Sequence, residues 1–274
     1  MSDRPAVPVG RRTALVLALA SAAGLMVFCW PLLVTGSSHE VDAPFILLAV
    51  LPVLVLVVIA SLSEGGMDPK ALAMLGVLAA VTAGLRPLSA GLGGVELVFF
   101  LLVLSGRVFG AGFGFVLGAL LLFASALITG GVGPWLPFQM IASAWVGLGA
   151  GLLPRRIRGR AEIVLLAGYG VAASYLYGLV MNLWFWPFSV GSDTSVSFVA
   201  GDPLALNLQR FVVYTLTTST AGWDTGRAIT TAVLVAVLGP AVLATLRRAN
   251  RLASFGADPV FEGETPPATR FTVG

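Results

Sequence analysis

Residues 93–154 constrain the fold of this chain most strongly, because 62 consecutive residues carry only two charged side chains, Glu96 and Arg107. Water-soluble domains do not contain so long a stretch with so few charges. Its middle segment, 108–129, is uncharged and long enough to cross a bilayer, which takes about 20 apolar residues. The stretch therefore predicts an all-α integral membrane protein.

Glycine recurs at every fourth position through this stretch, at Gly106, Gly110, Gly114 and Gly118. On a helix this spacing places the glycines on one face, where a neighbouring helix can approach closely. The pattern has two interpretations. One is ordinary packing between helices of the same chain, and the other is a face that slides against a partner subunit.

The composition of the whole chain agrees with a membrane protein that carries little else. Of 274 residues, 57% are hydrophobic and 11% are charged, and the mean hydropathy is +0.95. The net charge of +3 does not imply binding to nucleic acid, because most of the basic residues lie in short loops beside apolar segments. Basic residues in such loops set the orientation of a chain in the lipid bilayer.

The apolar segments divide the chain into four parts. Residues 1–12 form a polar leader, 13–64 hold two transmembrane helices, 65–252 form a six-helix core, and 253–274 form a disordered tail. The expected spans are 13–35, 43–63, 71–85, 95–105, 107–129, 136–153, 161–186 and 227–248. Within the core, residues 187–226 read as one long outer loop that keeps enough apolar residues to form an ordered cap.

The distribution of Lys and Arg predicts the orientation of these spans. With the N-terminus inside, 13 of the 16 basic residues fall in inside segments, and Arg86, Arg210 and Arg227 fall outside. Inside loops of membrane proteins are enriched in basic residues. The count therefore predicts a multi-pass protein of the plasma (inner) membrane with both termini cytoplasmic.

The sequence lacks the residues that most enzymes and pumps require. Lys70 is the only lysine and is followed by Ala71, so no ATP-binding P-loop is present. One histidine, His39, and one cysteine, Cys29, cannot form the usual metal sites or a catalytic triad. Ionisable groups are scarce at mid-membrane, where ion-coupled carriers place them. We therefore expect no catalytic residues and no metal, and energy supplied by other subunits.

Aromatic and polar residues gather near the predicted outer ends of the spans. Glu96 is an acidic residue near the outer end of the predicted span 95–105. The candidate site residues are Glu96, Trp135, Gln139, Asn182, Trp184, Tyr214, Trp223, Asp224 and Arg227. They suit a planar or large polar metabolite. The alternatives are an interfacial aromatic belt, a pair between Glu96 and Arg86, and a pair between Asp224 and Arg227.

Small residues also recur along the segment 71–85. Gly76, Ala80 and Gly84 are spaced by four, and so are Ala79 and Ala83. This spacing permits close contact with another helix.

Two segments carry a resemblance to a known family. The sequence A-L-A-M-L-G-V-L-A-A-V-T-A-G-L at 71–85 looks like the alanine-rich first helix of the substrate-binding S component of energy-coupling factor (ECF) vitamin transporters. The sequence V-F-F-L-L-V-L-S-G-R-V-F-G-A-G-F-G-F-V-L-G-A-L at 98–120 resembles that family's glycine-repeat turn into its third helix. The resemblance covers about 69–251, and the two N-terminal spans depart from the family's pattern.

The resemblance implies a function and partners. An S component captures a vitamin at the outer face, and a coupling membrane subunit with two ATPase subunits delivers it inward, so ATP is used in trans and this chain needs no cofactor. The loops 87–94, 130–137 and 187–226 would cover the ligand, with a corrinoid ranked slightly before a flavin. The family's docking helix implies partner contacts at Gly76, Ala79, Ala80 and Ala83. The competing functions are an autonomous permease or channel, a membrane enzyme and a non-catalytic assembly factor.

Overall fold

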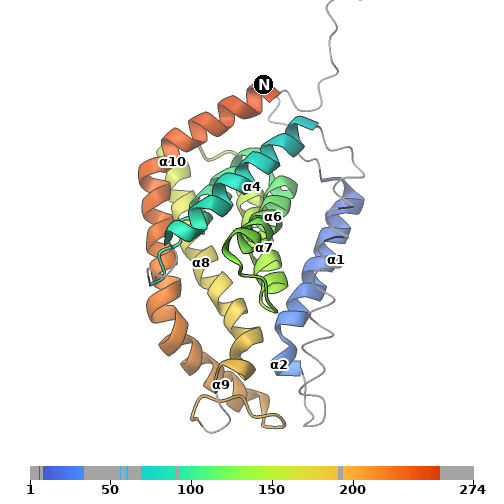
Figure 1. The fold of residues 1–274 in the computed structure, drawn as a ribbon, viewed down its shortest axis with the longest axis vertical. Helices are drawn as coiled ribbons and strands as arrows, with labels where there is room; N and C mark the ends of the chain where they lie inside the picture. The colour runs from blue at the N-terminus through green and yellow to red at the C-terminus, as the bar shows by residue number, and fades with distance from the viewer. Residues whose placement is uncertain are drawn as a thin grey trace, which may run out of the picture.

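The computed structural model describes residues 6, 9–33, 56, 60, 69–89, 93–190 and 194–253, and the regular elements in these ranges are all helical. The predicted span 43–63 and the tail beyond Ala253 lie almost entirely outside the described residues. The helices are α1 (Arg11–Phe28), α2 (Trp30–Leu33), α4 (Pro69–Ser89), α5 (Val98–Phe109), α6 (Ala111–Thr129), α7 (Leu136–Leu152), α8 (Arg160–Ser189), α9 (Leu204–Thr215), the π-helix η1 (Leu216–Asp224) and α10 (Thr225–Ala253), as Figure 1 shows.

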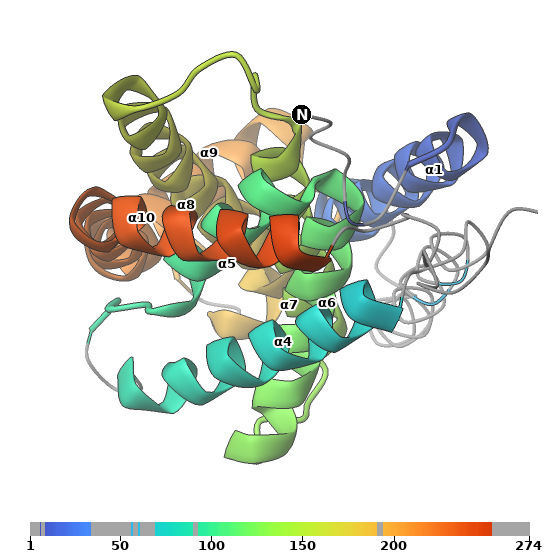
Figure 2. The same cartoon turned by 90° about the horizontal axis from the view of Figure 1, so that it is seen from above.

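Five described helical stretches are long and apolar enough to cross a membrane: α1, α4, α6, α8 and the run from Leu204 to Ala253. Helices α5 and α7 are apolar but shorter. The prediction of an all-α, multi-pass membrane protein is therefore confirmed at this level. The division into a six-helix core and two additional spans stays a prediction. Helix α1 lies on the opposite side of the bundle from α10 (Figure 2).

The chain reverses between α5 and α6 at a single residue, Gly110, whose φ of 101° suits glycine and few other residues. The sequence placed this division at 105–107 instead, because Arg107 interrupts the apolar run. In the structure α5 continues through Arg107 to Phe109, since the guanidinium finds buried partners and does not need to end the helix.

The glycine repeat is used for packing inside the chain. A Cβ atom added at Gly114 would overlap the carbonyl of Gly147 on α7, and one added at Gly118 would overlap the carbonyl of Ser143. Gly106 on α5 approaches the same carbonyl of Gly147. Of the two interpretations of the repeat, the structure therefore favours ordinary packing, because α7 already occupies this face.

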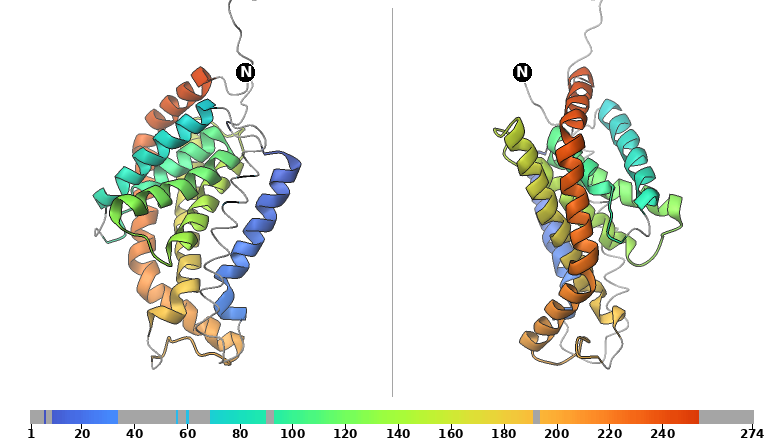
Figure 3. Two further views of the ribbon diagram at one scale, coloured as in Figure 1. Left: turned by 45° about the vertical axis from the view of Figure 1, so that its right-hand side comes forward. Right: turned by 90° about the vertical axis from the view of Figure 1, so that its left-hand side faces the viewer.

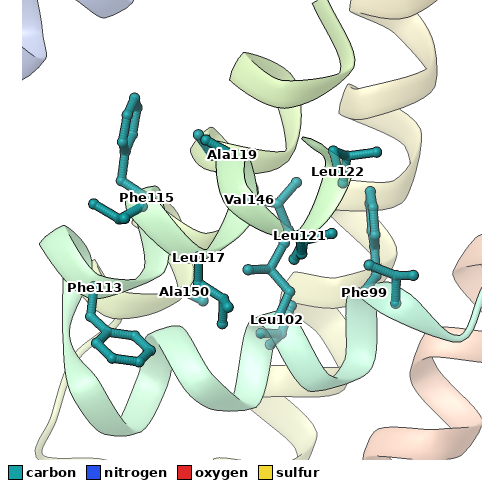
Figure 4. Packing of buried hydrophobic residues seen from close by; sticks show 14 of the residues in the cluster. Phe99, Leu102, Phe113, Phe115, Leu117, Ala119, Leu121, Leu122, Val146 and Ala150 are labelled. Carbon is teal, nitrogen blue, oxygen red and sulfur yellow. The ribbon is translucent and has the colours of Figure 1, made fainter. Parts of the chain in front are cut away.

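Large apolar side chains fill the space around these close backbone contacts. Phe99 and Leu102 from α5 lie beside Leu121 from α6 and Val146 from α7 (Figure 4). All four are buried, and Leu102 and Leu121 are fully enclosed. Between helices in lipid, such packing supplies much of the attraction, because lipid tails are as apolar as the side chains.

Charged side chains join the helices at the end of the bundle where α4 begins and α10 ends, which we term the basic end. Arg107 Nε donates to Glu162 Oε1 at 2.7 Å, and Arg247 Nη2 donates to the same oxygen at 2.6 Å. The Arg107 guanidinium also donates to the carbonyls of Leu153, Pro154 and Ile157. One carboxylate and two arginines thus hold α5, α8, α10 and the turn after α7 together.

The predicted outer loop 187–226 is mostly helical. Helix α8 continues to Ser189, and from Leu204 the chain runs as one helical stretch through η1 into α10 (Figure 3). The polar sequence of η1 looked like a loop. In the structure Thr217 and Thr218 donate to the carbonyls of Val213 and Tyr214, so their hydroxyls are satisfied by the helix itself.

Candidate ligand-binding site

A cavity of about 300 Å³ lies at the end of α4, α5 and α10 opposite the basic end. It is formed where α4 ends, α5 begins, the turn between α6 and α7 passes, and η1 meets α10. The lining residues are Arg86, Pro87, Gly94, Val95, Glu96, Thr129, Gly131, Trp135, Trp223 and Arg227. Segments up to 141 residues apart in sequence, from Arg86 to Arg227, thus meet at one small cavity.

Four of the nine predicted site residues line this cavity: Glu96, Trp135, Trp223 and Arg227. Two further predicted residues lie directly behind it. Gln139 accepts a hydrogen bond from Arg86, and Asp224 accepts one from Arg227. The structure therefore brings six of the nine together.

Arg227 is held in place from several sides. Its Nη1 donates to Asp224 Oδ1 at 3.0 Å and to the carbonyl of Ser174 at 3.3 Å. Its guanidinium carbon lies 4.8 Å from the ring centroid of Tyr177 and 5.5 Å from that of Phe99. Contacts of this kind attract a guanidinium to aromatic rings. The side chain is thus fixed before any ligand arrives.

Asp224 anchors this arrangement from inside the bundle. It is only 1% exposed, and its second oxygen, Oδ2, accepts a hydrogen bond from Ser219 at 2.9 Å. The carboxylate lies against Gly178 on α8, where a Cβ atom would overlap it. Ser219 and Asp224 are both in η1, and π-helical segments are frequent at functional sites. The predicted pairing of Asp224 with Arg227 is present in the structure.

Arg86 brings the end of α4 to the same cavity. Its Nη1 lies 3.5 Å from Ser125 Oγ, and its Nη2 donates to Gln139 Oε1 at 3.4 Å. The sequence treated Arg86 only as a helix end and as a partner for Glu96. Arg86 is followed by a proline at a predicted outer helix end, and it is one of only three basic residues predicted to lie outside. This position was the signal for a site residue.

The segment before α5 passes very close to η1. A Cβ atom at Gly94 would lie 2.9 Å from the carbonyl oxygens of Gly222 and Trp223, and Gly94 has a φ of 88°. Glycine is therefore required there for two reasons. This contact places Glu96 beside the start of α10, and its Oε1 is buried without a hydrogen-bond partner.

Two tryptophans give the cavity its flat apolar surfaces. Trp135 is 42% exposed and Trp223 is 53% exposed. The Trp135 indole folds over its own turn, donating from Nε1 to the carbonyl of Gly131, and its ring occupies the space that a Cβ atom of Gly133 would need. Both rings therefore remain partly open to a ligand.

Asn182, Trp184 and Tyr214 do not line the cavity. Helix α8 reaches the level of the cavity at Ser174 and Gly178 and then continues for 11 residues, about 16 Å. Trp184 stacks on Phe138 with centroids 3.9 Å apart. Tyr214 is buried beside Trp186 and accepts a hydrogen bond from Ser189. These residues build the part of the molecule beyond the cavity.

The four predicted docking residues lie on two different faces of α4. Gly76 and Ala80 are exposed, and a Cβ atom at Gly76 would have no neighbour within 4 Å. Ala79 and Ala83 are buried in the bundle, with Ala83 fully enclosed. A partner can contact only the first pair, because the second already packs inside the chain.

Comparison with known proteins adds no name to this geometry: no family model, no curated protein and no solved structure matches the chain.

Proposed function

We propose that this chain is the ligand-capturing membrane subunit of an ECF-type importer, with ATP hydrolysis supplied by other subunits. One observation carries the proposal. The cavity is lined by residues from all three segments that the resemblance implies as covers of the ligand: 87–94, 130–137 and 187–226. Charged groups and two partly open indoles in one cavity suit a small polar ligand with a flat face.

Two further features support a subunit that depends on partners. The exposed small residues Gly76 and Ala80 form a strip of small side chains on α4, beside the exposed Leu72, Val77 and Val81, which suits the proposed contact with a coupling subunit. Arg227 and Asp224 form an ion pair with each other. These two residues are the polar pair that a membrane enzyme could have used for catalysis, and their charged groups are used in this contact instead. A membrane enzyme and an assembly factor remain the competing functions.

The size of the cavity changes the order of the proposed ligands. Binding sites for small molecules range from about 300 to 1,000 Å³, and this cavity lies at the lower limit. A flavin-sized ring system fits such a volume, whereas a corrinoid would lie largely outside it. We therefore place a flat heterocycle first and a corrinoid second.

Native mass spectrometry of the purified chain, expressed in a vitamin-replete host, tests the proposal. We expect a bound small molecule, and we expect Trp135→Ala or Trp223→Ala to weaken its binding roughly tenfold, as loss of one aromatic stacking surface does. Phe123→Ala is the matched control, because Phe123 is an exposed aromatic residue outside the cavity. A chain that carries no small molecule and shows no thermal shift with a panel of vitamins would contradict the proposal.

A further inference from the structure

Two buried polar atoms at the cavity have no hydrogen-bond partner: Glu96 Oε1, an acceptor, and Arg227 Nε, a donor. Both residues line the cavity. Buried polar atoms in folded proteins are nearly always satisfied, and leaving one without a partner is costly. An unmatched acceptor and an unmatched donor at one site therefore indicate what a ligand has to supply.

The charges around the cavity balance. By formal charge, Arg86 and Arg227 bring two positive groups to it, Glu96 brings one negative group, and Asp224 is paired with Arg227 directly behind it. Two positive and two negative groups sum to zero. A phosphate or carboxylate ligand would enter beside the buried Glu96 carboxylate and leave one negative charge unmatched. An uncharged ligand leaves the balance intact.

We infer that the cavity takes an uncharged ligand with an amide or imide edge, whose N–H donates to Glu96 Oε1 and whose carbonyl accepts from Arg227 Nε. Such an edge presents a donor beside an acceptor, which complements the two unmatched atoms. The partly open indoles of Trp135 and Trp223 then contact the flat part of the ligand. This inference rests on the proposed function and specifies the chemistry of its ligand.

Two sources of this edge can be distinguished by experiment. Flavins carry a ring imide, and corrinoids carry carboxamide side chains. The probes are riboflavin with its N3-methyl derivative, and cobinamide with cobyrinic acid, in which carboxylates replace the carboxamides. Each is titrated against the full-length chain in nanodiscs by isothermal calorimetry. We expect one parent compound to bind and its altered partner to bind roughly 10–100-fold more weakly, the range for a lost hydrogen bond to a charged group.

The variant Glu96→Met completes a double-mutant cycle. This variant should bind the parent compound more weakly by a similar factor. Its affinities for the parent compound and for the altered partner should be nearly equal, because the acceptor at residue 96 is gone. Glu96→Gln keeps an acceptor oxygen and should retain most of the binding. Asp202→Leu is the matched control, since Asp202 pairs with Arg210 away from the cavity. Thermal unfolding shows whether the Glu96 variants remain folded.

The outcomes separate the inference from the proposed function. Equal binding of a parent compound and its altered partner overturns the inference and leaves ligand capture intact. If native mass spectrometry identifies a different ligand that lacks an amide or imide edge, the inference fails. A chain that binds nothing in either experiment overturns both.

Discussion

Under the proposed function, single residues at the cavity differ in whether they serve the ligand or hold the site together. Asp224 belongs to the second group, because both of its oxygens are used within the chain, by Arg227 and Ser219. Glu96 belongs to the first, since one of its oxygens is buried and unmatched. The two carboxylates should therefore respond differently to substitution.

Replacing Asp224 should destabilise the whole fold. In Asp224→Leu the Arg227 guanidinium stays buried without its counter-charge, which costs about 3–5 kcal/mol in other proteins. The midpoint of thermal unfolding in detergent should fall accordingly. Asp202→Leu breaks a partly exposed pair with Arg210 and should cost no more than about 1 kcal/mol. Equal shifts for the two variants would show that the buried pair contributes no more than an exposed one.

The sequence could identify residue types for the site better than it could identify their positions. Glu96, Trp135, Trp223 and Arg227 were predictable because charged and aromatic residues are unusual in this chain. Trp184 had the same signal and faces Phe138 instead. Nothing in the sequence showed that α8 continues past the cavity, because its last turns are as rich in aromatic residues as a ligand site.

At the scale of helices, α5, α6 and α7 form the tightest part of the molecule. Their contacts run through glycines on both partners, so backbone lies against backbone. Helix α4 is different, because Gly76 and Gly84 on its outer face have open space beside them. Identical glycine-to-alanine changes on these two sets of helices should therefore have opposite effects.

Gly118→Ala should destabilise the fold by roughly 1–3 kcal/mol, because the new methyl group forces α6 away from Ser143 on α7. Gly84→Ala, the matched control, should be neutral or stabilising by up to about 1 kcal/mol, since alanine is the better helix former and the space is open. Thermal unfolding of both purified variants makes the comparison. A destabilising Gly84→Ala together with a neutral Gly118→Ala would contradict the assigned faces.

Helix types were more predictable than helix ends. The apolar runs gave α6, α7 and α8 to within a few residues, because length and hydropathy decide whether a segment spans a membrane. The break at Gly110 was missed, since only the backbone conformation separates it from the other glycines of the repeat. The helical run through η1 was missed because its threonines and serines are typical of loops. In a helix, these residues can instead donate to backbone carbonyls of the preceding turn.

At the scale of the whole molecule, the cavity and the exposed face of α4 are linked by one helix. Arg86, near the end of α4, lines the cavity, and Gly76 and Ala80 lie two to three turns earlier on the outer face. Under the proposed function, the same helix contacts both ligand and partner. The all-α, multi-pass architecture was predictable from composition. The convergence of five segments on one cavity was not, because it depends on tertiary packing.

Ala80→Trp should abolish ATP-driven uptake in cells that also express a coupling subunit and its ATPases, while ligand binding by the purified chain stays unchanged. The reason is that Ala80 is exposed on α4, and a large ring there would prevent close approach of a partner helix. Ala83→Trp is the contrasting variant. It should impair folding and binding as well, because Ala83 is fully buried. Normal uptake by Ala80→Trp would exclude this face as the contact.

The charged residues of the basic end also bear on how the chain is made. Arg107 lies in a long apolar run, and its counter-charge, Glu162, is synthesised 55 residues later; Arg247 follows 85 residues after that. While α5 and α6 are being made, Glu162 has not yet been synthesised, so this carboxylate cannot yet pair with Arg107. Glu162 is synthesised next, and Arg247 follows as part of α10. The order of synthesis is thus also the order in which these charged residues become available to pair.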